Sequence, residues 1–175
     1  MNIRCFISID VPEKIQKEIK KIQNSLPEFV GKTTELENLH LTLKFLGEIS
    51  KEKVEGVKTR LSKIKFNNFE VELNNLGVFS ENFIRIVWLN LKGAEKFQKE
   101  IDFVLEGLFE FEKRFMGHLT IARIKNIKDK KQFLSDLKKI KIPRIKFSVN
   151  CFKLKSSMLR NKGPVYEAIG KYNLE

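Results

Sequence analysis

Both histidines of this 175-residue chain begin the same tripeptide, His-Leu-Thr, at residues 40–42 and again at 118–120. The flanking residues, LHLTLKFLG and GHLTIARI, alternate apolar and polar positions, as expected for a β-strand with one buried face. Before each tripeptide come a strand-like run and an amphipathic helical pattern, in the first 46 residues and again over about residues 83–124. Repetition of one structural unit accounts for this parallel. We therefore expect two related units, each ending in a His-Leu-Thr strand.

The other segments complete a mixed pattern of helices and strands. Apolar residues at helical spacing predict helices over residues 13–26, 51–64, 94–108 and 129–140. Runs of β-branched and aromatic residues predict strands over residues 3–9, 39–47, 69–79, 82–91, 115–124, 143–157 and 164–170, with a loop over 31–38. Several strands are adjacent in sequence, so we expect an α+β fold with mainly antiparallel sheets. Two related lobes would face a central cleft with helices on the outside, and the absence of a Gly-, Pro- or Ser-rich linker makes residues 1–175 a single bilobal domain.

The direction of side chains on a strand suggests how the repeated tripeptide works. Residues i and i+2 share a face, so His40 and Thr42 point together, and Phe45 takes the opposite face with the leucines. The same geometry pairs His118 with Thr120. Two such strands across one cleft would place two imidazoles and two hydroxyls around a space for one phosphate.

This set of groups suits the hydrolysis of a phosphodiester. One group must take a proton from water, and another must give a proton to the departing oxygen. Histidine titrates near neutral pH, which makes His40 and His118 the candidate catalytic pair. Thr42 and Thr120 are the candidate phosphate-binding residues, since hydroxyls can donate to the non-bridging oxygens. Neither tripeptide contains an acidic residue or a cysteine, so the ligands for zinc are lacking and we expect no metal.

The charge and hydropathy of the chain limit its partners and location. A formal charge of +12 favours an anionic partner, nucleic acid above all, although Lys-rich surfaces also mark adaptation to heat. The basic tracts at residues 125–132 and 138–146 are candidates for contact with an RNA backbone. The N-terminal residues lack the apolar core of a signal peptide, and no run is long enough to span a bilayer. We expect a cytoplasmic protein with no membrane partner.

Four blocks of the sequence resemble a known family. They are the opening RCFISIDVP, the block NLHLTLKFLGEI, the block GHLTIAR and the closing KLKSSMLRNKGPVYEAI. Together they resemble the two-histidine (2H) phosphoesterase superfamily, in its branch of RNA 2′,3′-cyclic phosphodiesterases, also described through 2′-5′ RNA ligase activity. One departure is Gly117, since the branch often has Pro before the second motif.

The resemblance implies hydrolysis of a terminal 2′,3′-cyclic phosphate of RNA to a 2′-phosphomonoester, with no metal and no cofactor. His40 would be the proton donor to the 3′ oxygen and His118 the proton acceptor that activates water, with Thr42 and Thr120 holding the phosphate. The partners would be RNA 3′ ends with a cyclic phosphate, tRNA-derived ends among them, and the protein would be a monomer. Two alternatives stay open: 2′-5′ RNA ligation by the reverse chemistry, and a non-catalytic module that binds RNA or nucleotides.

Three further residues are candidate substrate contacts. Lys44 shares the His40 face under strict alternation and would approach the phosphate or lie at the cleft rim. Strict alternation puts Arg123 away from the cleft, as part of a surface ion pair, unless a bulge turns the chain. Tyr166 would line a nucleotide pocket.

Overall fold

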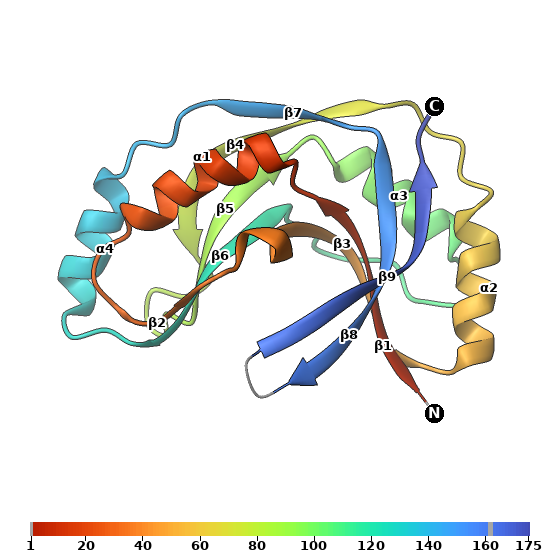
Figure 1. The fold of residues 1–175 in the computed structure, drawn as a ribbon, viewed down its shortest axis with the longest axis horizontal. Helices are drawn as coiled ribbons and strands as arrows, with labels where there is room; N and C mark the ends of the chain where they lie inside the picture. The colour runs from red at the N-terminus through yellow and green to blue at the C-terminus, as the bar shows by residue number, and fades with distance from the viewer. Residues whose placement is uncertain (1, 161–162) are drawn as a thin grey trace.

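The structure is a computed structural model, and it describes residues 2–160 and 163–175 (Figure 1). Asn161 and Lys162 of the closing sequence block lie outside these residues. The helices are α1 (Glu13–Asn24), α2 (Lys51–Leu61), α3 (Glu95–Val104), α4 (Lys130–Lys139) and the 3-10 helix η1 (Leu36–Asn38). The strands are β1 (Ile3–Asp10), β2 (Val30–Thr33), β3 (His40–Ile49), β4 (Phe69–Val78), β5 (Ile86–Lys92), β6 (His118–Asn126), β7 (Ile145–Val149), β8 (Cys151–Arg160) and β9 (Gly163–Asn173).

The described strands form one curled antiparallel sheet. Its order is β7-β4-β5-β6-β3-β1-β8-β9, and β2 pairs with β6 beside this path. The repeated unit is present as β1-α1-β3 and as β5-α3-β6, and the two copies meet where β3 pairs with β6 at Leu41 and Leu119. Figure 1 shows the four α-helices around the outside of the curl. The expected α+β fold, with mainly antiparallel strands and outer helices, is confirmed.

The helices attach to the sheet through the apolar faces that the sequence predicts. Ile15, Ile19 and Ile22 of α1 are buried, as are Phe97 and Ile101 of α3. These side chains join the apolar residues of the strands in one core. None of the helices in the described part of the chain combines the length and apolar character needed to cross a membrane.

Two expected segments differ in the structure. The expected loop over residues 31–38 contains most of β2 and all of η1. Gly31 allows this pairing, because a Cβ built there would lie 2.2 Å from the carbonyl oxygen of Arg123 on β6. The expected strand over residues 143–157 is two strands that part at Asn150, and β7 pairs with β4 while β8 pairs with β1. Both differences depend on partners that are distant in sequence.

The alternation of side chains between the two faces of the strand is interrupted one residue after the threonine of each tripeptide. On β1 the partners of Thr42 and Lys44 are consecutive residues, so Leu43 is an extra residue on β3. On β5 the partners of Thr120 and Ala122 are likewise consecutive, which makes the isoleucine between them the extra residue on β6. Each is a β-bulge, and a bulge changes the face on which the following residues lie. The two repeats therefore share a bulge as well as a tripeptide.

The bulge on β3 overturns the expected directions of two side chains. Lys44 turns away from the His40 face and becomes buried, with 4% of its surface exposed. Its ammonium pairs with Asp102 of α3 and donates to the carbonyl oxygen of Glu110 at 2.6 Å. The expectation that Lys44 approaches the phosphate was therefore wrong. Phe45, expected on the buried face, is 70% exposed and lines the cleft described below.

Asp102 ties three parts of the chain together. Its carboxylate also accepts from the side chain of Gln98 at 2.8 Å and from the backbone N–H of Glu112 at 2.9 Å. Burial alone would raise the pKa of Asp102, but these bonds and the Lys44 charge outweigh burial and hold the pKa below its usual value. The pair thereby fixes α3 and the segment after it, which leads to β6.

Removal of one member of this pair should destabilise the fold strongly. Lys44→Met leaves the Asp102 carboxylate buried without its cation, which costs about 3–5 kcal/mol of unfolding free energy. Urea denaturation followed by circular dichroism measures the loss. Lys17→Met is the matched control, because the Lys17–Glu13 pair is exposed and an exposed pair contributes about 0–1 kcal/mol. Equal stability losses in the two variants would contradict the assigned role.

Candidate active site

A large cleft of about 1450 Å³ lies against the sheet, and the four residues of the two tripeptides that carry polar side chains line it. His40 and Thr42 come from β3, and His118 and Thr120 come from β6. All four are partly exposed, whereas the leucines between them are buried. The structure therefore brings together the residues that the sequence predicts as the site.

The pairing of Leu41 with Leu119 sets the arrangement of these four residues. In an antiparallel pair, the residues on either side of a matched pair also face each other, so His40 lies across from Thr120 and Thr42 across from His118. The two histidines are then diagonal neighbours, which in a regular ladder lie about 7–8 Å apart, with their Cβ atoms somewhat closer. The site has approximate twofold symmetry about the leucine pair, with an imidazole and a hydroxyl on each side.

The two imidazoles are oriented in the same way. Nδ1 of His40 lies 2.7 Å from the carbonyl oxygen of Asn38, and Nδ1 of His118 lies 2.8 Å from that of Met116. A carbonyl oxygen can only accept, so in both rings Nδ1 carries the hydrogen and donates it. Nε2 is left as the nitrogen that can exchange a proton with a ligand.

His40 sits in an apolar and positively charged part of the site. Its ring centroid is 5.0 Å from that of Phe6 and 5.2 Å from that of Tyr166. Burial above all, together with the charges of Lys155 and Arg123, lowers the pKa of His40 to about 4, although the Asn38 carbonyl and the charge of Asp10 act to raise it. His40 of the unliganded protein is therefore neutral at pH 7, with an unprotonated Nε2.

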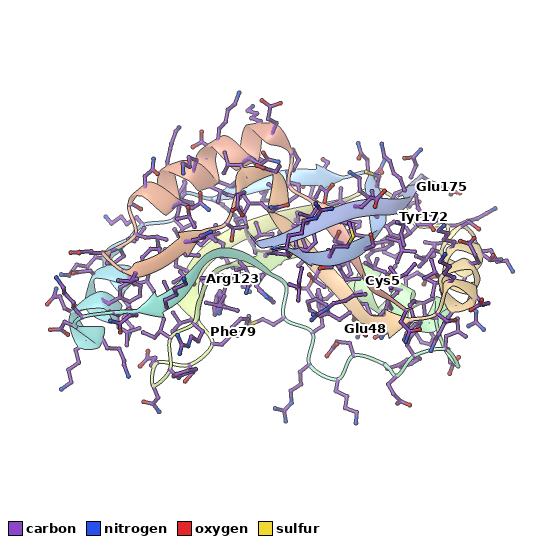
Figure 2. The ribbon with its side chains drawn as sticks, turned by 60° about the horizontal axis from the view of Figure 1, so that its bottom comes forward. Cys5, Glu48, Phe79, Arg123, Tyr172 and Glu175 are labelled. Carbon is purple, nitrogen blue, oxygen red and sulfur yellow. The ribbon has the colours of Figure 1, made fainter. Side chains whose placement is uncertain are left out.

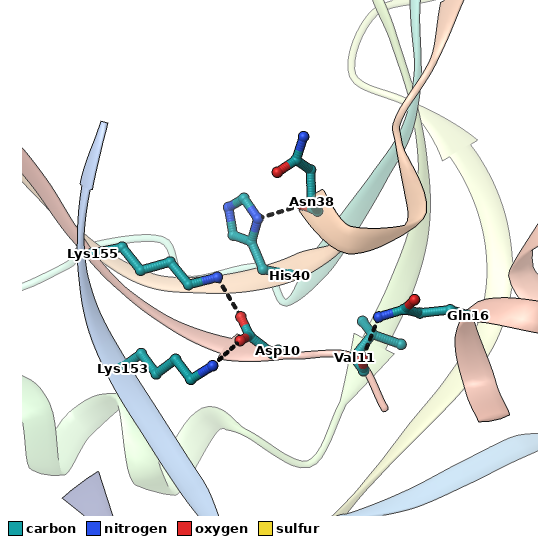
Figure 3. A network of polar contacts seen from close by, with 7 residues as sticks. All are labelled: Asp10, Val11, Gln16, Asn38, His40, Lys153 and Lys155. Atoms are coloured by element: carbon teal, nitrogen blue, oxygen red, sulfur yellow. Dashed lines mark hydrogen bonds and ion pairs between the residues drawn. The ribbon is translucent and has the colours of Figure 1, made fainter. Parts of the chain in front are cut away.

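An ion-pair network stands beside His40 (Figure 3). Asp10 is the register partner of His40 on β1, and it pairs with Lys155 and, at 2.6 Å, with Lys153. Lys155 is only 7% exposed, so its charge acts in a partly desolvated region. The sequence analysis did not identify this network. The fit of Asp10 to two lysines more than 140 positions later depends on the β1–β8 pairing, which no local pattern reveals.

His118 has an aromatic neighbour of its own. The ring of Phe79 meets it edge to face, with centroids 5.0 Å apart and an angle of 89° between the planes. Phe79 follows β4 and is 56% exposed. Figure 2 shows Phe79 and Arg123 in the same half of the molecule. Both histidines are thus flanked by aromatic rings, which restricts how each imidazole can turn.

The structure also places the other predicted contacts. Arg123 lines the cleft because the bulge on β6 turns it there, which is the exception to a surface ion pair that the sequence analysis allowed. Tyr166 lines the cleft, as the sequence analysis expected. The first basic tract contributes Lys125 to the cleft wall. In the second tract, Arg144 and Lys146 pair with Glu72 outside the cleft.

The described residues contain no group of three or more His, Cys, Asp or Glu side chains that could hold a metal ion. The polar groups that line the cleft are mainly imidazoles, hydroxyls, ammonium groups and guanidinium groups, with one carboxylate, that of Glu35. The cations and hydroxyls can bind an anionic ligand, phosphate above all, and the imidazoles can also exchange protons with it.

Comparisons with known proteins agree with this chemistry. A family model described as "LigT like Phosphoesterase" matches residues 9–88 and 91–166. An RNA 2′,3′-cyclic phosphodiesterase of Methanocaldococcus jannaschii is 36% identical over 97% of this chain and 100% of its own length. One of Archaeoglobus fulgidus is 34% identical, over 94% of this chain and 97% of its own length. The crystal structure of Escherichia coli LigT complexed with phosphate superposes with a TM-score of 0.74 at 25% identity, covering 99% of this chain and 98% of that one.

The charge environment of His40 predicts its titration. NMR spectra of the free protein should show the His40 imidazole gaining its proton only as the pH falls to about 4. Lys155→Met should move the midpoint upward, since that cation lowers the pKa of His40. Lys20→Met, an exposed change on α1 that removes the same charge, should leave it in place. A midpoint near 6.5 in the unaltered protein would contradict the described environment.

Proposed function

Because the chain belongs to the LigT-like phosphoesterase family, we propose that it hydrolyses the terminal 2′,3′-cyclic phosphate of RNA to a 2′-phosphomonoester. The observation that carries the proposal is the symmetric placement of His40, Thr42, His118 and Thr120 around the β3–β6 junction. Relatives that align with nearly the whole chain are RNA 2′,3′-cyclic phosphodiesterases. The free thiols of Cys5 and Cys151 fit a reducing compartment and support action in the cytoplasm.

The reaction needs one proton transfer on each side of phosphorus. Neutral His118 takes a proton through Nε2 from the attacking water, and a P–O bond forms. Protonated His40 gives its Nε2 proton to the 3′ oxygen as the P–O3′ bond breaks, which leaves the phosphate on the 2′ oxygen. The hydroxyls of Thr42 and Thr120 donate hydrogen bonds to the non-bridging oxygens, where negative charge develops.

Binding of the substrate favours the protonated form of His40, which takes up the proton from solvent before donating it. In the empty cleft, burial and two nearby cations keep this imidazole neutral at pH 7. A phosphate anion between the two histidines attracts positive charge and partly cancels the field of Lys155 and Arg123. The His40 imidazole therefore takes up a proton as the anion enters, and it becomes an acid only when there is a leaving group to protonate.

Loss of either imidazole should remove most of the activity. With an oligonucleotide that ends in a 2′,3′-cyclic phosphate, and with EDTA present, the unaltered chain should release the 2′-phosphate. His40→Ala and His118→Ala should each lower the rate about 10²- to 10⁴-fold, and Lys20→Ala should not. Turnover only with added metal would refute the proposed chemistry. RNA binding without turnover would indicate a binding module, and joining to a 5′-hydroxyl strand would indicate a ligase.

Replacement of the 3′ oxygen by sulfur should separate the roles of the two histidines. A thiolate leaves without a proton more readily than an alkoxide does, so this substrate depends less on a general acid. His40→Ala should recover much of its lost rate on the 3′-thio cyclic phosphate, while His118→Ala should stay impaired. Recovery of His118→Ala alone would show that the two roles are reversed.

A further inference from the structure

The cleft holds more positive charge than one phosphate needs. Five cationic side chains and one carboxylate, apart from the histidines, line it. The cations are Arg4, Lys32, Arg123, Lys125 and Arg160, and the carboxylate is Glu35. Within the described residues none of the five cations belongs to an ion pair, although ten such pairs occur elsewhere. Their charge is therefore available to a ligand.

Three of these cations form a cluster, which we call the β2–β6 cluster: Lys32, Arg123 and Lys125. Lys32 and Arg123 are register partners on antiparallel strands. Like charges in directly opposite positions destabilise a strand pair, so this arrangement is unfavourable in the absence of an anion. Lys125 lies two residues after Arg123 on β6, at an irregularity of the β2–β6 pairing, and its side chain also lines the cleft. All three side chains are exposed and line the cleft.

The backbone under the cluster is held firmly. Gly31 lets β2 approach β6 so closely that a Cβ there would lie 2.2 Å from the carbonyl oxygen of Arg123. The carbonyl oxygen of Ile121, the extra residue of the bulge, accepts from the N–H of Thr34 at 2.9 Å and from the buried side chain of Gln23 at 3.0 Å. Gln23 also donates to the Thr34 carbonyl oxygen at 2.8 Å. These contacts therefore fix the backbone that carries the two opposed cations, Lys32 and Arg123.

The cluster lies beyond the catalytic centre along the same strand. Without the extra residue Ile121, Arg123 and Lys125 lie about two and four strand positions after Thr120, or about 7–14 Å at the usual rise of a strand. A stacked nucleic acid strand carries one phosphate for about every 3.4 Å of its axis, so this distance corresponds to a few nucleotides. The aromatic rings at the other side, Phe6 and Tyr166, offer stacking surfaces for the terminal nucleoside.

We propose that the β2–β6 cluster binds the internal phosphates upstream of the terminal nucleotide, so that the substrate is an RNA chain of several nucleotides and not a free cyclic mononucleotide. This inference rests on the proposed function and assigns the direction in which the RNA strand leaves the catalytic centre. The terminal cyclic phosphate lies between the histidines, and the preceding phosphates follow β6 toward Lys125.

Substrates of different length test the proposal. With one terminal nucleotide throughout, kcat/KM should rise from the nucleoside 2′,3′-cyclic monophosphate through oligonucleotides of a few residues and then level off. Oligonucleotides with neutral methylphosphonate linkages upstream should lose the gain. For the charged oligonucleotides, log(kcat/KM) should fall linearly with log[salt], and Lys32→Ala with Lys125→Ala should reduce the slope by about 0.7 for each lysine.

A control variant and the cyclic mononucleotide distinguish failure of this inference from failure of the proposed function. Lys14→Ala with Lys20→Ala removes the same charge from exposed positions on α1 and should keep the length dependence. Turnover of the cyclic mononucleotide as efficient as that of every oligonucleotide would overturn the inference while the proposed function stands. A length dependence that persists with methylphosphonates or in the Lys32/Lys125 variant would also overturn it. No turnover of any substrate would refute the proposed function itself.

Discussion

The site depends on one residue pair, Leu41 with Leu119, where the two halves of the sheet meet. Elsewhere in the sheet, neighbouring strands are matched over several residues, but β3 and β6 are matched at this pair. The buried leucines fix the junction through apolar contact, and the residues beside them necessarily face the other side of the sheet. A slip of either strand by one residue would turn its imidazole into the core and its leucine into the cleft.

The two bulges extend this arrangement from the catalytic groups to the groups around them. Because each bulge begins one residue after the threonine, it leaves His40 and His118 in place and changes only the residues that follow. On β3 it places Lys44 in the core, where the ammonium holds α3 through Asp102. On β6 it places Arg123 in the cleft. The same irregularity therefore supplies a structural ion pair in one repeat and a cation that lines the cleft in the other.

The sequence allowed prediction of the features that depend on local pattern. The strands that carry the tripeptides, the amphipathic helices and the shared face of His40 and Thr42 follow from periods of two and of about 3.6 residues. Features set by distant partners were beyond that reasoning. The directions of Lys44 and Arg123 depend on which residues of β1 and β5 are skipped, and β2 exists because Gly31 fits against β6. Composition indicated an anionic partner but not which of the many lysines would meet it.

The positive charge of the cleft has two effects that reinforce each other. Lys155 and Arg123 attract an anionic substrate, and the same charges lower the pKa of His40 in the empty site. An anion that enters the cleft offsets the positive charges that disfavour the protonated form of His40. Binding of the substrate and protonation of His40 therefore favour each other. Water in the cleft carries no negative charge to offset these cations, so the His40 imidazole stays neutral until the phosphate binds. A strongly basic cleft is thus compatible with a histidine acid at neutral pH, because the substrate brings further negative charge to His40.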